Sequence, residues 1–99
     1  SARVWGNMSE LRQSVTIVNK RGLHARASAK FVGAVAALES DVRVAVAKDA
    51  KKAVGGSILG LMMLGAAKGD TVDVIVEGDE AEAVLGQLVA LIEDGFGEE

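Results

Sequence analysis

The chain contains a single histidine, His24, and the residues around it suit phosphoryl chemistry. A β-branched segment gives way to an alanine-rich one at this point, so we expect the histidine at the start of a helix. Unpaired backbone N–H groups and the positive end of the helix dipole would both stabilise a negative group on the ring. Arg26 adds a planar cation suited to phosphate oxygens. This pattern predicts a histidine that accepts a phosphoryl group.

A lone histidine also has other common roles. It can be an exposed bystander in a loop or a hydrogen-bonded structural residue. Metal binding is a weaker alternative, because the chain has no second histidine and no cysteine, and zinc would depend on carboxylates. The pair Gly55-Gly56 indicates a loop and not a nucleotide cradle, because no P-loop lysine follows it. We therefore predict neither a metal site nor a cofactor.

Length and composition narrow the class of protein. The 99 residues suffice for one small domain, and 49% of them are hydrophobic, which is ample for a compact core. The net charge of −3, with dispersed basic residues, argues against nucleic-acid binding. The longest apolar stretch, residues 58–67, is too short to span a bilayer. The lack of cysteine fits a reducing compartment, and we expect a cytoplasmic monomer without membrane insertion.

Hydrophobic periodicity predicts the order strand, helix, strand, strand, helix, strand, helix. Ser57 is the expected N-cap of the second helix and Asp79 that of the third, which Gly95 should end. Each strand has one apolar face and the helices are amphipathic, which indicates an α+β sandwich of two layers: a four-stranded, mainly antiparallel sheet with three helices on one face. The expected strands are residues 13–19, 41–47, 52–54 and 71–77, and the first two helices are residues 25–39 and 58–64.

Two motifs then indicate a family. The run Gly22-Leu23-His24-Ala25-Arg26 and the later run from Ser57 to Gly65, with the element order and chain length, resemble HPr, the histidine-containing phosphocarrier of the bacterial phosphoenolpyruvate-dependent phosphotransferase system. The resemblance covers residues 13–95 and implies an open-faced βαββαβα sandwich that carries phosphoryl groups without being an enzyme. Residues 1–12 would be an N-terminal extension, in which residues 1–7 are either an addition ahead of a natural start at Met8 or a disordered segment. Residues 96–99 would be a frayed acidic tail.

The resemblance assigns roles to individual residues. His24 matches the family's phosphorylated histidine, which phospho-enzyme I modifies on Nδ1 and which passes the group to a IIA component. Arg26 matches the active-site arginine. Ser57 matches the regulatory serine, which an ATP-dependent HPr kinase/phosphorylase phosphorylates in many bacteria. For Arg26 the plain alternative is a solvated helix residue, and for Ser57 it is an N-cap alone.

The chain departs from the family's usual motif at two positions. The family has proline and alanine after the arginine, where this chain has Ala27 and Ser28. Proline in the first helical turn fixes φ, so its loss should cost about 0.3–1 kcal/mol of stability. We expect this loss to be tolerated, because alanine is itself a good helix former. These residues resemble alphaproteobacterial members, which often belong to the nitrogen-related, regulatory branch of the family rather than to sugar transport.

A short apolar helix next to the predicted site suggests contact with partners. Not every apolar side chain of so short a helix can point inward, and methionine suits adaptable surfaces. The alternative to phosphoryl carriage is a regulatory docking module whose affinity is switched by phosphorylation. The expected partner-binding residues are Leu23, Ile58, Leu59 and Met62.

Overall fold

The structure is a computed structural model, and it describes residues 10–98. The predicted order of strands and helices is confirmed, with one additional short 3₁₀ helix after the last α-helix. Element boundaries differ from the predicted ones by at most three residues. The elements are β1 (Glu10–Thr16), α2 (Ala25–Ala36), β2 (Val42–Lys48), β3 (Lys51–Val54), α3 (Ile58–Met63), β4 (Thr71–Gly78), α4 (Ala81–Glu93) and η1 (Gly95–Gly97).

The four strands form one antiparallel sheet in the order β1-β4-β2-β3. The central strand β4 pairs with β1 on one side and with β2 on the other, so that Val74 lies between Gln13 and Val46. Val72, Val74 and Val76 point to one face and are buried, as the alternating pattern of β-branched residues predicts.

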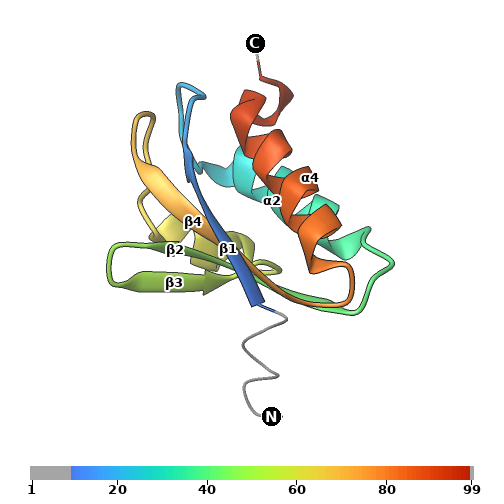
Figure 1. Ribbon diagram of the computed structural model, residues 1–99. Coiled ribbons are helices and arrows are strands. Elements are labelled where there is room, and N and C mark those ends of the chain that lie inside the picture. Colours follow the sequence, from blue (N-terminus) through green and yellow to red (C-terminus); the bar gives the residue numbers. More distant parts are fainter. Residues whose placement is uncertain (1–9, 99) are drawn as a thin grey trace.

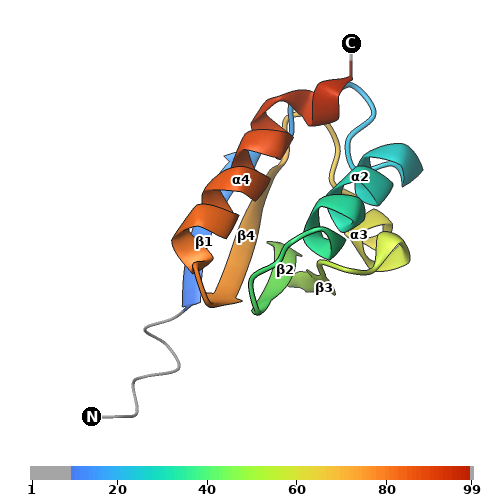
Figure 2. The ribbon, with the colours of Figure 1, turned by 90° about the vertical axis from the view of Figure 1, so that its right-hand side faces the viewer.

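The helices cover one face of this sheet and leave the other open (Figures 1 and 2). The core lies between the two layers, where Phe31 of α2, Leu61 of α3 and Leu88 of α4 are almost completely buried. The predicted two-layer α+β sandwich is therefore confirmed. Within residues 10–98, none of the helices is long and apolar enough to cross a membrane.

The first strand begins earlier than predicted. Residues 10–12, assigned to an N-terminal extension, pair with residues 75–77 of β4. The sequence did not predict this pairing, because Glu10 and Arg12 are charged. Both lie on the uncovered side of the sheet, where polar residues are tolerated. Residues 1–9 of the predicted extension lie outside the described residues.

The start of α4 also differs from the prediction. The N-cap is Glu80 and not Asp79, and Glu80 adopts a left-handed conformation without a side-chain capping bond. The preceding Gly78 has a φ of +128°, and a Cβ there would lie 2.4 Å from the backbone oxygen of Asp41. The close approach of two backbones thus sets the course of this turn, and side-chain capping does not.

The prediction of a frayed tail was wrong for residues 96–98. Gly95 does end α4, with a φ of +65°, but the chain then turns back onto the core. Phe96 is 1% exposed, and the Lys30 ammonium donates a 2.7 Å hydrogen bond to its backbone oxygen. The acidic composition of residues 96–99 predicted a solvated tail. Burial of the Phe96 ring instead compensates for the conformational entropy lost when the segment becomes ordered.

Candidate functional site at the start of helix α2

His24 is the N-cap of α2. Its backbone is extended (φ −76°, ψ −177°), and its Nδ1 accepts a 3.2 Å hydrogen bond from the backbone N–H of Arg26. Its backbone oxygen accepts the N–H of Ser28 at 2.9 Å, the first bond of the helix. The ring therefore lies at the positive end of the helix dipole, as predicted, and its side chain is 19% exposed.

The loop before the helix is held against the segment that follows α3. Leu23 donates its backbone N–H to the oxygen of Ala66 at 3.0 Å. Gly22 has a φ of +64°, and a Cβ at this position would lie 2.3 Å from the same oxygen. The buried Ser28 hydroxyl donates to the Leu23 oxygen at 3.2 Å. Only glycine fits this close approach, which determines where the histidine lies.

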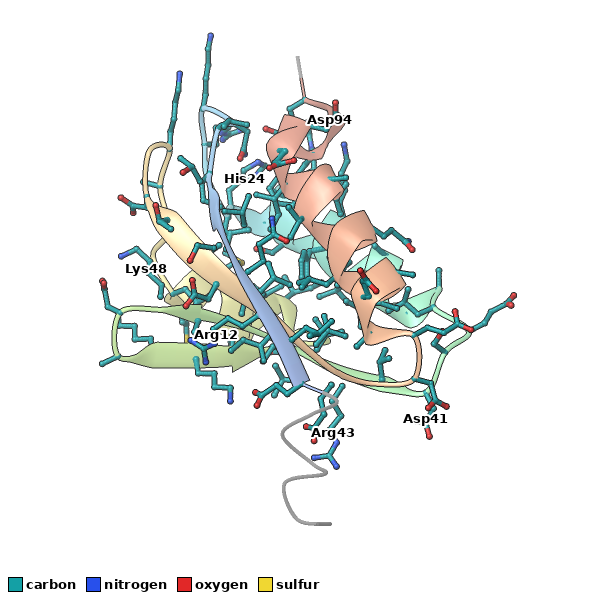
Figure 3. All side chains as sticks on the ribbon, in the orientation of Figure 1. Arg12, His24, Asp41, Arg43, Lys48 and Asp94 are labelled. Carbon is teal, nitrogen blue, oxygen red and sulfur yellow. The ribbon has the colours of Figure 1, made fainter. Side chains whose placement is uncertain are left out.

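The other ring nitrogen of His24 contacts a residue far along the chain. Nε2 lies 2.7 Å from Oε2 of Glu98, 74 residues away in sequence. His24 lies at the end of the molecule where α4 finishes, near the labelled Asp94 (Figure 3). Because Nδ1 accepts a hydrogen bond, the proton of the neutral ring resides on Nε2, which donates to the Glu98 carboxylate.

Glu98 is itself held in place. The Asn19 amide donates to its Oε1 at 3.2 Å and to the backbone oxygen of Gly22 at 2.8 Å. The hydrogen bond to His24 lowers the pKa of Glu98, and burial opposes this effect. The hydrogen bond from Asn19, the charge of His24 when its ring is protonated and the charge of Lys30 lower the pKa further. The carboxylate is therefore ionised at neutral pH.

Arg26 lies on the exposed first turn of α2. Its guanidinium makes no ion pair with any other residue between 10 and 98. An exposed guanidinium two residues after the histidine can turn toward an anion on Nδ1 without first breaking a salt bridge.

Ser57 is the N-cap of α3, as predicted, and its Oγ accepts the backbone N–H of Gly60 at 2.9 Å. In the helix that follows, Ile58, Leu59 and Met62 are 40%, 67% and 40% exposed, and we call these three residues the α3 surface. Leu23 differs from them, because it is 6% exposed and belongs to the core, so its side chain offers little surface to a partner.

The structure brings the two predicted motifs together. Helix α3 packs against α2, and the bond from Leu23 to Ala66 joins the histidine loop to the chain just after α3. The α3 surface therefore belongs to a helix that neighbours the one His24 caps. In the part of the chain that the structure describes, no cluster of three or more histidine, cysteine or acidic side chains could hold a metal ion.

The sequence did not indicate Glu98, which contacts Nε2 of the ring, or the residues that hold Glu98 and the last turn in place. Asn19, Glu98 and the Lys30 that anchors the last turn carry no local motif. One usable indication was Phe96, an isolated aromatic residue between two glycines directly after the last helix. An aromatic ring in such a position favours docking onto the core over fraying.

The fold and the capping histidine define a class, the small βαββαβα sandwiches with a histidine at the start of the first helix. Residues 11–94 match the family model described as the PTS HPr component phosphorylation site. The chain belongs to the HPr family of phosphocarriers of the phosphotransferase system, which are not enzymes.

Individual relatives match over almost their whole length. The phosphocarrier protein HPr of Neisseria meningitidis is 48% identical over 89% of this chain and 97% of its own. The phosphocarrier protein NPr of Shewanella violacea is 41% identical over 92% and 98%. The crystal structure of HPr-C-His from Thermoanaerobacter tengcongensis superimposes with a TM-score of 0.81, at 43% identity over 90% and 98% of the two chains. The resemblance stated from the two motifs is confirmed.

Proposed function

We propose that His24 accepts a phosphoryl group on Nδ1 from phospho-enzyme I and passes it to a IIA-type component of the phosphotransferase system. The observation that carries this proposal is the position of Nδ1, which faces the backbone N–H of Arg26 at the start of α2. The family to which the chain belongs supports the class of reaction.

The surroundings of Nδ1 suit a group that must be held and then released. Backbone N–H groups and the helix dipole stabilise the phosphate oxygens, and the Arg26 guanidinium supplies a charge-assisted contact. The ring keeps part of its surface exposed, so a partner's nucleophile can approach the phosphorus in line. A fully buried group would be stable and useless to a carrier.

The α3 surface supports docking of partners beside the histidine. Leu59 is two-thirds exposed, and its neighbours in the α3 surface add flexible or branched apolar groups. Apolar side chains exposed this far on a helix that packs against α2 favour a contact role. We leave the buried Leu23 out of this surface. For a protein with this role we propose a cytoplasmic location and a monomeric state.

Ser57 is the proposed regulatory site, as a substrate of an HPr kinase/phosphorylase. Its hydroxyl caps α3 immediately before the α3 surface. A phosphate there adds negative charge at a helix N-terminus, which does not disfavour folding. Its effect would instead fall on docking, because a partner would have to desolvate the new charge.

The same surface supports a second candidate function, a docking module whose affinity for partner enzymes changes when His24 is phosphorylated. Its supporting observation is the exposure of Ile58, Leu59 and Met62. Replacing Leu59, the most exposed of the three, with serine should weaken binding to partners while leaving the fold intact. Wild-type affinity in that variant would count against both the docking module and the docking surface.

The deciding experiment is incubation of the protein with enzyme I and phosphoenolpyruvate. Mass spectrometry should find one phosphate, labile in acid and stable in base, on His24 of the wild type. His24→Ala should accept none. Equal labelling of the two proteins would overturn the assignment, and so would a phosphate that survives acid.

A further inference from the structure

The contact between Glu98 and His24 lies on the side of the ring away from the proposed phosphate. The carboxylate is 2.7 Å from Nε2, while Nδ1 faces the first turn of the helix. Both side chains are mostly buried, 19% and 18% exposed, so water competes poorly for this hydrogen bond. The mechanism based on Nδ1 and Arg26 leaves the contact without a role.

We propose that Glu98 is a positioning residue for phosphoryl transfer, which keeps the proton on Nε2 of His24 in both the free and the phosphorylated protein. This inference rests on the proposed function. It deepens that function by assigning a separate task to each ring nitrogen: Nδ1 carries the phosphoryl group and Nε2 retains a proton throughout.

The proton on Nε2 assists acceptance in two ways. It leaves Nδ1 unprotonated, so that its lone pair can exchange the 3.2 Å hydrogen bond from the Arg26 N–H for a bond to phosphorus. The bond from phosphorus to the donor then breaks, with its electron pair leaving on the donor. No proton leaves the ring in this step, so the ring becomes positively charged. The Glu98 carboxylate, in contact with Nε2–H, offsets that charge where it forms.

The same proton assists release. When the acceptor's nucleophile attacks, the bond from phosphorus to Nδ1 breaks and its electron pair returns to Nδ1. With the proton still on Nε2, the leaving group is neutral imidazole; without it, the leaving group would be the far more basic imidazolate. A carboxylate that holds the proton therefore keeps the phosphoryl group transferable.

Several contacts keep the carboxylate in position. Asn19 donates to its other oxygen, and burial of Phe96 with the bond from Lys30 anchors the turn before it. The exposed Arg26 of α2 and Asp94 at the end of α4 are charged groups of the same region, and neither is hydrogen-bonded to the ring. Glu98 is the carboxylate bonded to it within the described residues.

The test compares Glu98→Gln with Glu93→Gln, which removes the same charge from the exposed last turn of α4. With enzyme I and phosphoenolpyruvate, Glu98→Gln should accept phosphate about tenfold more slowly than the wild type, because a charge-assisted bond becomes a neutral one. Glu93→Gln should match the wild type.

A second measurement needs no partner and separates this role from docking. The phosphorylated proteins are purified and their spontaneous hydrolysis is followed in buffer. In alkaline buffer Glu98→Gln should lose its phosphate several-fold more slowly, because fewer rings keep the Nε2 proton that makes imidazole a good leaving group. In acid, where every ring is protonated, the two rates should agree.

The outcomes separate this inference from the proposed function. Wild-type protein that accepts no phosphate would overturn both. Normal labelling of the wild type with unchanged acceptance and hydrolysis in Glu98→Gln would overturn only the role of Glu98. Faster acceptance by Glu98→Gln would also overturn it, because the carboxylate would then be repelling the incoming phosphate.

Discussion

Helices α2 and α3 both begin at a side chain that accepts a backbone hydrogen bond, and they differ in what else that side chain contacts. Helix α2 begins at His24, whose Nδ1 accepts a backbone N–H at 3.2 Å, and α3 begins at Ser57, whose Oγ accepts one at 2.9 Å. The Ser57 side chain is bonded to Gly60, within the first turn of its own helix. His24 has a second polar atom, which is bonded to Glu98 from the far end of the chain.

This difference separates a structural cap from a reactive one. A hydroxyl that bonds only to its own helix stabilises that helix and can be read from local sequence. An imidazole bonded on both sides has its tautomer and orientation determined by two elements, which is how a nucleophile is prepared for reaction. The following changes should act on one helix start and spare the other.

The largest effect is expected from Gly22→Ala. The new Cβ would lie 2.3 Å from the Ala66 oxygen, at a residue with a φ of +64°, so the histidine loop must move. We expect a loss of about 2–3 kcal/mol in the free energy of unfolding, measured by urea denaturation, and slower acceptance of phosphate.

The control for this change precedes the other helix. A Cβ at Gly56, just before Ser57, would meet nothing within 4 Å. Gly56→Ala should therefore change the free energy of unfolding by no more than about 0.5 kcal/mol. Equal losses in the two variants would mean that the contact with Ala66 does not govern the position of the loop.

Arg26→Ala should slow transfer without unfolding the protein. The side chain is exposed and has no ion pair among residues 10–98, so stability should change by less than about 0.5 kcal/mol. The rate of phosphate acceptance should fall more than tenfold, because a charge-assisted contact contributes about 1.5–3 kcal/mol. Arg21→Ala, also exposed, is the control, and both rates are measured with enzyme I.

Substitutions of Ser57 should separate stability from docking. Ser57→Ala removes the bond to Gly60 and should cost about 1 kcal/mol, whereas Ser57→Thr, which keeps a hydroxyl, should cost less. Ser57→Asp should keep or raise the melting temperature and yet slow acceptance by His24. Unchanged transfer kinetics in Ser57→Asp would leave Ser57 a cap alone.

The smallest effect concerns pH. The pKa of Glu98 is lowered in the folded protein, chiefly by the hydrogen bond from His24, from an ordinary value of 4.5. Its ionised form therefore contributes stability above pH 4.5, which is lost as the pH falls through the lowered pKa. His24→Ala should bring this pKa back toward 4.5, as followed by the carboxyl carbon shift in NMR. A titration identical in the two proteins would exclude the contact in solution.

The order of elements could be predicted from sequence because each depends on residues close together in the chain. The alternation of apolar and polar residues over Thr71–Gly78 and the N-cap at Ser57 could be recognised without knowing which strand or helix lies beside them. The predicted boundaries of the elements were less accurate where a neighbouring segment of the fold determines the end of the element. Residues 10–12 form a strand because β4 lies beside them, and α4 begins after Glu80 because the backbone at Gly78 approaches Asp41.

The candidate site likewise has local features, which the sequence predicts, and long-range contacts, which it does not. The sequence by itself determined that a histidine caps the second element, that an arginine follows it and that Ser57 caps α3, since each of these is a relation within one or two turns. Only the tertiary structure decided that Leu23 is buried while Leu59 is exposed, and that Glu98 lies against Nε2. These contacts join segments up to 74 residues apart, and they exist because burial of Phe96 folds the end of the chain back onto α2.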